Sequence, residues 1–147
     1  MLNLQDISDT GPAVVRMPVL MRETRLWGHY EVLMCGARWR VKRLTIEPGK
    51  STSFQRHLHR SEHWLVVEGM AKIRQRAVTP IGDEKIGDRY LATGHTADID
   101  VGDWHQIMNP GTEPLVMIEV WMGGDLREND IERANVPQTT DTNRPEK

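Results

Sequence analysis

The chain has 147 residues, a formal net charge of −2, 38% apolar residues and 27% charged residues. This length suits one domain with its own core, and the near balance of charges gives no basis for binding nucleic acid or an anionic membrane. The single cysteine, Cys35, excludes a disulfide framework within the chain, and no apolar run approaches the roughly 18 residues of a membrane span. We therefore expect a cytoplasmic protein without contact to nucleic acid or membrane.

Short strands divided by turn residues are predicted from the first third of the chain onward. Residues 1–22 are expected to form an N-terminal arm. Alternating apolar and polar residues predict a strand over 39–49, which Pro48-Gly49 ends. Residues 63–75 indicate two strands joined by a tight turn at Glu68-Gly69.

The second half continues the same pattern. Residues 77–95 are expected to form a hairpin extension or a loop, and 96–111 two short strands around Gly102. Residues 113–123 are the strongest β segment, with Leu115, Met117, Glu119 and Trp121 on one face. The polar residues 124–147 are expected to form a C-terminal segment and tail, in which "DLRENDIERAN" is either a short helix or a surface turn. The pattern predicts an all-β sandwich or barrel, with the barrel over 23–123.

Three of the six histidines lie in the stretch "QRHLHRSEHW", residues 55–64. If this stretch begins as a strand, alternation places Gln55, His57 and His59 on one face. Glu62 follows across a turn, and His105 after a glycine turn is a possible fourth ligand. The pattern is compatible with a metal site and equally with histidines that only make hydrogen bonds on a surface strand.

The spacing of these residues is similar to the two sequence motifs of the cupin superfamily. One run of matching spacing ends at a glycine that six intervening residues separate from Glu62, and a second run ends at an asparagine. The matching positions are Gly49, Gln55, His57, Glu62 and Gly69, then Gly94, Asp100, Gly102, His105 and Asn109. Glutamine at 55 replaces a histidine, and aspartate at 100 replaces a proline. The resemblance implies a single-domain cupin double-stranded β-helix, also called a jelly-roll barrel.

A narrower resemblance covers roughly residues 25–133. The segments "RLWGHY", "RVKRLTIEPG", "STSFQRHLHRSEHWLVVEGMA", "GDWHQIMNPGTEPLVMIEVWMG" and "DIER" resemble those of type II phosphomannose isomerases, which convert mannose 6-phosphate. The chain departs from that pattern at Leu26, which replaces a proline, at Trp121, which replaces a glutamine, and at Arg127, which replaces a glycine. The resemblance implies an aldose–ketose isomerase that uses a divalent metal ion, with zinc favoured.

The motif register implies the metal ligands Gln55, His57, Glu62 and His105. Two histidines, a carboxylate and an amide oxygen suit a divalent ion such as zinc, manganese, iron, cobalt or nickel. His59 is the alternative to Gln55, because the two share a face of the expected strand. His63 is expected to point away from the ion.

Isomerisation moves a proton between C1 and C2 of an open-chain sugar and needs a base near the carbon-bound proton. The candidate catalytic residues are Glu119 and His59, with Lys42 assisting at an oxygen. A sugar phosphate also needs a cationic clamp, which arginine forms best. Arg133, at the end of the "DIER" match, is the first choice for this substrate-binding role, and Arg60 and Arg25 are the others.

Mannose 6-phosphate/fructose 6-phosphate isomerisation is therefore the expected function, with a small-molecule sugar phosphate as the partner. Two alternatives stay open because a cupin barrel hosts many chemistries. One is another cupin enzyme that modifies a sugar, or a metal dioxygenase. The other is a non-catalytic sugar-binding cupin that keeps its metal. Unpaired sheet edges also favour a homodimer.

Overall fold

The computed structural model describes residues 18–78, 81–82 and 84–134. The expected tail over 138–147 and most of the expected N-terminal arm lie outside these residues. The described residues form eleven strands and no helix, which confirms the all-β expectation. In chain order the strands are β1 (Met21–Arg25), β2 (Gly28–Cys35), β3 (Trp39–Ile46), β4 (Gln55–Arg56), β5 (Arg60–Glu68), β6 (Met70–Val78), β7 (Glu84–Ala92), β8 (Thr96–Ile99), β9 (Trp104–Met108), β10 (Leu115–Gly123) and β11 (Glu132–Arg133).

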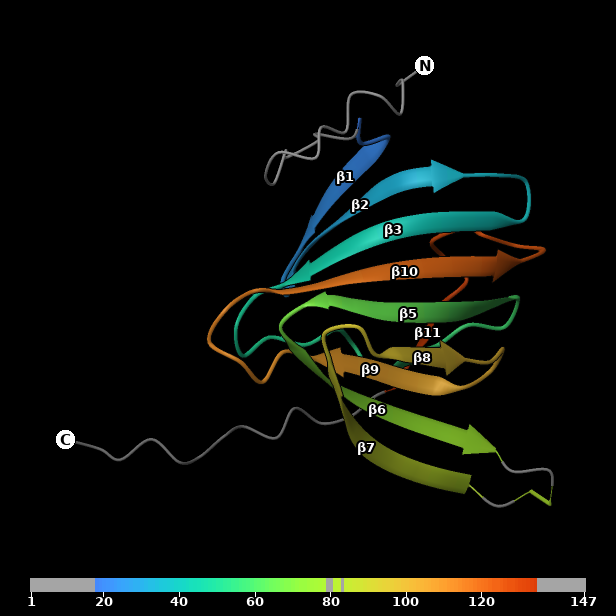
Figure 1. Ribbon diagram of the computed structural model, residues 1–147. Helices are drawn as coiled ribbons and strands as arrows, with labels where there is room; N and C mark the ends of the chain where they lie inside the picture. The colour runs from blue at the N-terminus through green and yellow to red at the C-terminus, as the bar shows by residue number, and fades with distance from the viewer. Residues whose placement is uncertain (1–17, 79–80, 83, 135–147) are drawn as a thin grey trace.

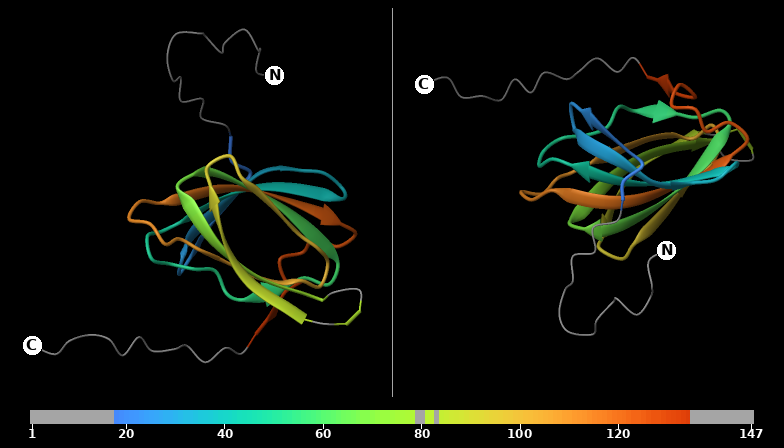
Figure 2. Two further views of the ribbon diagram at one scale, coloured as in Figure 1. Left: turned by 60° about the horizontal axis from the view of Figure 1, so that its bottom comes forward. Right: turned by 90° about the horizontal axis from the view of Figure 1, so that it is seen from above.

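Two antiparallel sheets face each other and enclose the interior (Figures 1 and 2). The first sheet has the order β1-β2-β3-β10-β5-β8, and the second has the order β11-β4-β9-β6-β7. Strands far apart in the sequence therefore lie side by side: β10 lies between β3 and β5, and β9 lies between β4 and β6. This arrangement brings residues 55–62 and residue 105 to the same interior.

Strand β10 shows how alternation builds the interior. Leu115, Met117, Glu119 and Trp121 are buried, as predicted, and the residues between them are more exposed. The core adds large apolar side chains from both sheets, among them Trp64, Ile46, Ile73 and Ile99. Burying a side chain of this size contributes about 1.5–3 kcal/mol. The apolar residues on the inward faces of the strands therefore stabilise the fold, and the polar residues on the same faces form the site.

The tight turn predicted at Glu68-Gly69 is present between β5 and β6. Gly69 has a φ of +87°, a backbone conformation that side chains with a Cβ atom rarely adopt. Strands also occupy the other predicted positions, 39–46, 96–99, 104–108 and 115–123. Between 77 and 95, where a hairpin extension or a loop was expected, β7 pairs with β6 along its whole length.

The segment after β10 contains no helix among its described residues. Residues 124–131 cross the end of the barrel irregularly, and β11 then pairs with β4 through Glu132 opposite Arg56. The boundaries expected at residues 22–23 and 123–124 stay a prediction. Cys35 is exposed because it lies at the end of β2, where the strand leaves the core.

Asn109 ties the turn after β9 to β3. Its Nδ2 donates to the carbonyl oxygens of Ile46 and Glu113, both at 2.8 Å, and its Oδ1 accepts from the Gly111 N–H at 2.9 Å. Asn109 and Ile46 are both buried, so removal of the Asn109 side chain takes a hydrogen-bond donor from the Ile46 carbonyl oxygen in the protein interior.

Replacing Asn109 with alanine is expected to lower the free energy of unfolding by about 1–3 kcal/mol. The midpoint of urea unfolding measures this loss, with the slope of the transition unchanged. Asn129→Ala is the control, because Asn129 is exposed and its replacement is expected to leave the midpoint in place. Equal midpoints for Asn109→Ala and the unaltered protein would contradict the assigned role.

Candidate functional site

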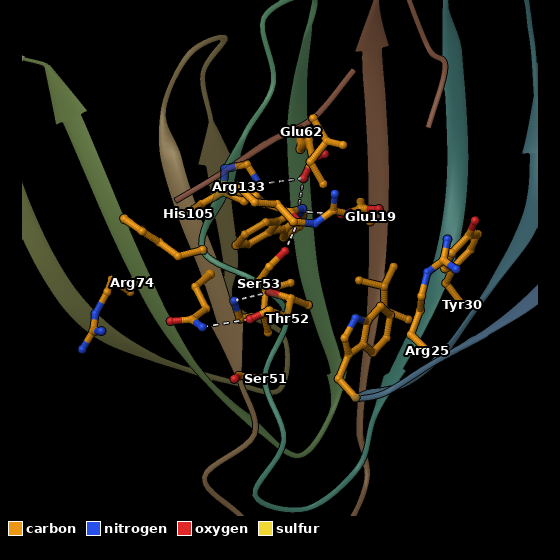
Figure 3. A pocket seen from close by; sticks show the side chains of 18 of the residues that line it. Arg25, Tyr30, Ser51, Thr52, Ser53, Glu62, Arg74, His105, Glu119 and Arg133 are labelled. Carbon is orange, nitrogen blue, oxygen red and sulfur yellow. Dashed lines mark hydrogen bonds and ion pairs between the residues drawn. The ribbon is translucent and has the colours of Figure 1, made fainter. Parts of the chain in front are cut away.

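Three of the four expected metal ligands meet in the interior. His57 follows β4, Glu62 lies on β5 and His105 lies on β9. One ligand atom from each lies within 4.8 Å of the others, and all three side chains are buried. Figure 3 shows Glu62 and His105 pointing toward each other from their separate strands. Three buried side chains of this kind, this close together, could hold a metal ion.

Both imidazoles are held by backbone carbonyl groups. His57 Nδ1 lies 2.6 Å from the Asp130 carbonyl oxygen, and His105 Nδ1 lies 2.8 Å from that of Asp103. A carbonyl oxygen only accepts, so each Nδ1 carries the proton and, in the neutral ring, each Nε2 presents a lone pair. The pKa of His105 is lowered, and burial is the largest of the effects that act on it. The neutral form of this imidazole is therefore favoured.

The two Nε2 atoms face the Glu62 carboxylate. His57 Nε2 lies 3.0 Å from Glu62 Oε1, and His105 Nε2 lies 3.7 Å from Glu62 Oε2. His105 Nε2 is buried and has no hydrogen-bond partner among the described residues. The lone pair of His105 Nε2 is buried without a donor, beside a carboxylate and a second imidazole, and this environment fits a divalent cation. The hydrogen bonds from Nδ1 to backbone carbonyl groups are the outer contacts that orient histidine ligands of this kind.

Gln55 lies opposite His105 in the pairing of β4 with β9, so the two side chains share a face. Its Oε1 accepts a hydrogen bond from the Ser53 hydroxyl at 2.7 Å, and Gln55 lines the same cavity as Glu62 and His105. This position is compatible with a fourth ligand, and the oxygen still has a second lone pair.

His59 does not lie in the cavity, in contrast to the expectation that it shares a face with Gln55 and His57. Strand β4 ends at Arg56, so the alternation of side chains does not extend to residue 59. The His59 side chain is 60% exposed and pairs with Asp130 at 3.1 Å. We therefore assign it neither a ligand role nor a catalytic role.

Arg60 is engaged at the cluster, and this corrects its expected role as a phosphate clamp. Its side chain is 2% exposed, its Nε lies 3.2 Å from Glu62 Oε1, and its Nη1 donates to the carbonyl oxygens of Arg127 and Asp130. Its guanidinium also covers the Trp121 ring at 3.4 Å from the centroid. Because these contacts occupy the guanidinium, Arg60 supports Glu62.

A second buried carboxyl group, that of Glu119, lies beside Glu62. The Trp64 Nε1–H donates to both, at 3.1 Å to Glu62 Oε2 and 3.2 Å to Glu119 Oε1. Burial opposes ionisation of Glu62, but the polar contacts and electrostatic interactions with its neighbours His57, His105 and Arg60 together lower its pKa. Burial and the neighbouring Glu62 raise the pKa of Glu119 well above its usual range. The pair therefore divides into an ionised carboxylate, that of Glu62, and a carboxyl group able to exchange a proton, that of Glu119.

Lys42 faces Glu119 across β3 and β10. Its Nζ donates to Glu128 Oε1 at 2.7 Å and lies over the rings of Trp121 and Tyr30, 3.5 Å and 4.0 Å from the centroids. Burial lowers the pKa of Lys42, while the carboxylates of Glu119 and Glu128 oppose this effect. The Lys42 side chain is only 3% exposed, so its ammonium group lies inside the protein and not in the solvent.

A cavity of about 840 Å³ opens onto Glu62, His105, Lys42 and Glu119. Arg133 on β11 and Arg25 on β1 line it, on opposite sides in the view of Figure 3. Arg133 has no ion pair among the described residues, whereas Arg25 pairs with Glu23 and lies over the Tyr30 ring. Of the three arginines expected to bind a phosphate, Arg133 is therefore the best placed. Leu26, which replaces a proline of the phosphomannose isomerase pattern, also lines the cavity, and its side chain is exposed.

Two residues of the site were not predicted from the sequence. Glu128 binds Lys42, and Asp130 binds the residues around His57. Asp130 begins the "DIER" segment, so its place in that match was the only available signal. These contacts join residues 73 and 86 positions apart, and such pairs are not visible in the spacing of a sequence.

The comparisons with known proteins agree with this geometry. A family model described as "Mannose-6-phosphate isomerase C-terminal" matches residues 18–136. A mannose-1-phosphate guanylyltransferase of Escherichia coli is 43% identical over 109 residues, which are 74% of this chain and 21% of that protein. The chain thus spans about a fifth of the length of the curated relatives it matches.

Solved structures establish the fold. The capsular polysaccharide assembling protein CapF of Staphylococcus aureus superposes with a TM-score of 0.68 at 26% identity, over 81% of this chain and 33% of that one. A protein of Klebsiella pneumoniae with a double-stranded β-helix domain gives 0.58 at 23% identity, over 72% and 83%. The expected cupin double-stranded β-helix is confirmed. No helix in the described residues is long and apolar enough to span a membrane.

Proposed function

The chain belongs to the family of mannose-6-phosphate isomerase C-terminal domains, and from this premise we propose that it is a metal-dependent aldose–ketose isomerase. The substrate pair that we propose is mannose 6-phosphate and fructose 6-phosphate. The curated relatives carry the names of guanylyltransferases and of polysaccharide biosynthesis proteins, so the isomerase activity rests on the site. The observation that carries it is the buried Glu119 carboxyl group beside the His57–Glu62–His105 cluster.

The residues of the cluster divide the work of isomerisation. His57, Glu62 and His105, with Gln55 as the proposed fourth ligand, would hold a divalent ion, and we propose zinc. Such an ion, when bound, supplies positive charge to the sugar oxygens as the enediolate forms. Glu119 takes the proton from C2 of the open-chain aldose and returns it to C1, while a second proton moves from the C2 hydroxyl to the C1 oxygen, which gives the ketose without any net change in atoms. Its raised pKa makes Glu119 a stronger base than an ordinary carboxylate, which favours its acceptance of the carbon-bound proton.

The remaining residues bind and orient the sugar phosphate. Lys42 is buried beside Glu119 and is proposed to donate to the oxygen at C1 or C2. Arg133 lines the cavity without an ion pair among the described residues, and we propose that its guanidinium binds the phosphate, for which its planar geometry is suited. A homodimer formed through an edge strand stays a prediction, and β1 is an edge of the first sheet.

A coupled assay tests the proposed function. The protein loaded with zinc is expected to convert mannose 6-phosphate to fructose 6-phosphate, to lose this turnover in a chelator and to regain it when zinc is returned. Mannose without the phosphate is the matched negative substrate. If the fully zinc-loaded protein shows no turnover above background with any hexose 6-phosphate, the proposal is overturned.

The same measurements separate the alternatives. Trp121 is buried beside His57, with ring centroids 6.4 Å apart, and with Arg60 it fills one side of the cluster. This packing favours a non-catalytic sugar-binding protein as the second candidate. Thermal stabilisation by mannose 6-phosphate without turnover would support that reading, and oxygen consumption by protein loaded with iron would indicate a dioxygenase.

A further inference from the structure

Asp130 is a single residue that contacts all four residues from 57 to 60. It lies in the irregular segment that crosses the end of the barrel, and it is 8% exposed. Its carboxylate accepts hydrogen bonds from the backbone N–H groups of Leu58 and His59, each at 3.1 Å. One carboxylate oxygen also lies 3.1 Å from His59 Nδ1. The side chain therefore holds the backbone of a loop.

The backbone carbonyl of Asp130 holds the side chains on either side of that loop. It accepts from His57 Nδ1 at 2.6 Å and from Arg60 Nη1 at 3.2 Å. The first contact orients the imidazole so that its Nε2 faces Glu62, and the second orients the guanidinium that supports Glu62. The orientations of the His57 imidazole and the Arg60 guanidinium, which both contact Glu62, thus depend on where residue 130 lies.

Residues 57–59 have few other constraints. They lie between β4, which ends at Arg56, and β5, which begins at Arg60. The one backbone hydrogen bond to them from outside the strands, within the described part of the chain, is from the Gly102 N–H to the His57 carbonyl oxygen at 2.7 Å. Asp130 is itself fixed, because its N–H donates to the Arg127 carbonyl at 3.1 Å and β11 follows it on β4.

We propose that Asp130 is a positioning residue that holds the loop 57–59 in the conformation in which His57 can bind a metal ion. Its carboxylate fixes the two N–H groups of the loop, and its carbonyl fixes the imidazole. This inference rests on the proposed metal site. It extends that site to a segment about seventy residues further along the chain, which no ligand motif includes.

Zinc affinity, measured by competition with a chromophoric chelator, tests this role in the full chain. Asp130→Ala is expected to weaken zinc binding about 10–100-fold, the usual effect of losing an outer contact of a ligand. Asp130→Asn keeps one side-chain oxygen for an N–H of the loop and is expected to recover part of the affinity. Glu132→Gln, at an exposed position of the same segment, is the control and is expected to bind zinc like the unaltered protein.

The outcomes separate this inference from the metal site itself. If the unaltered protein binds no zinc, the proposed metal site fails. If it binds zinc and Asp130→Ala binds within twofold of it, the positioning role fails. Equal losses in Asp130→Ala and Asp130→Asn would also overturn the role, because the side-chain oxygen would then be irrelevant. If Asp130→Ala does not fold, the comparison of Asp130→Asn with Glu132→Gln decides, and equal affinities of these two would overturn the role.

Discussion

Replacing Glu119 with glutamine is expected to lower kcat for isomerisation by about 10²–10⁴-fold, the range that a positioned acid–base group supplies. Glutamine has nearly the same shape and keeps an oxygen for the Trp64 Nε1–H, which lies 3.2 Å from Glu119 Oε1, but it cannot accept the carbon-bound proton. Zinc content is expected to stay unchanged, because Glu119 is not among the clustered ligands. The measurements are steady-state kinetics with mannose 6-phosphate and metal analysis of the same samples.

Stability against pH gives a second readout for the Glu119→Gln variant. Burial and Glu62 raise the pKa of Glu119 in the folded protein above its ordinary value of 4.5. The unfolded chain therefore loses this proton at a lower pH than the folded protein does. The stability that the protonated group contributes is fully present below about pH 4.5 and declines as the pH rises through the folded value.

Glutamine does not titrate, so the variant is expected to gain stability relative to the unaltered protein as the pH rises above 4.5. Urea unfolding in the presence of a chelator measures this difference without a contribution from bound metal. Glu113→Gln is the control, because Glu113 is exposed. A variant with unaltered kcat would remove Glu119 from the mechanism, whatever its stability.

Replacing His105 or His57 with alanine has the other large expected effect. Each change removes one of the three clustered ligands, and we expect zinc affinity to fall by more than about 100-fold, beyond the loss caused by an outer contact. Isomerisation is then expected to fall to background at ordinary zinc concentrations. Chelator competition and the coupled assay measure the two effects on the same protein.

His63→Ala is the matched control for these ligand variants. His63 lies one residue from Glu62, but its side chain is 41% exposed and pairs with Asp98 at 2.6 Å outside the barrel. The His63→Ala variant is expected to keep both metal and activity.

His105→Gln serves as a second ligand variant that keeps more of the buried volume than His105→Ala. Full metal content in His57→Ala would end the case for a cation at this cluster.

The sequence was sufficient to predict some of the strands and part of the site. Alternation depends on the pleat of the strand and needs no distant partner, which is why the shared face of Leu115, Met117, Glu119 and Trp121 on β10 could be predicted. The spacing of His57, Glu62 and His105 also indicated one site, because their places along a cupin barrel follow from the order of its strands. These three residues do meet in the structure.

The tertiary structure alone decided the directions of side chains outside the strands. His59 was expected beside Gln55, but β4 ends at Arg56 and the loop turns His59 toward Asp130. Arg60 was expected at a phosphate, but it is buried against Glu62. In a loop the direction of a side chain follows its backbone angles and its distant partners. For residues 57–60 the main partner is Asp130, and only the folding of the chain brings these positions together.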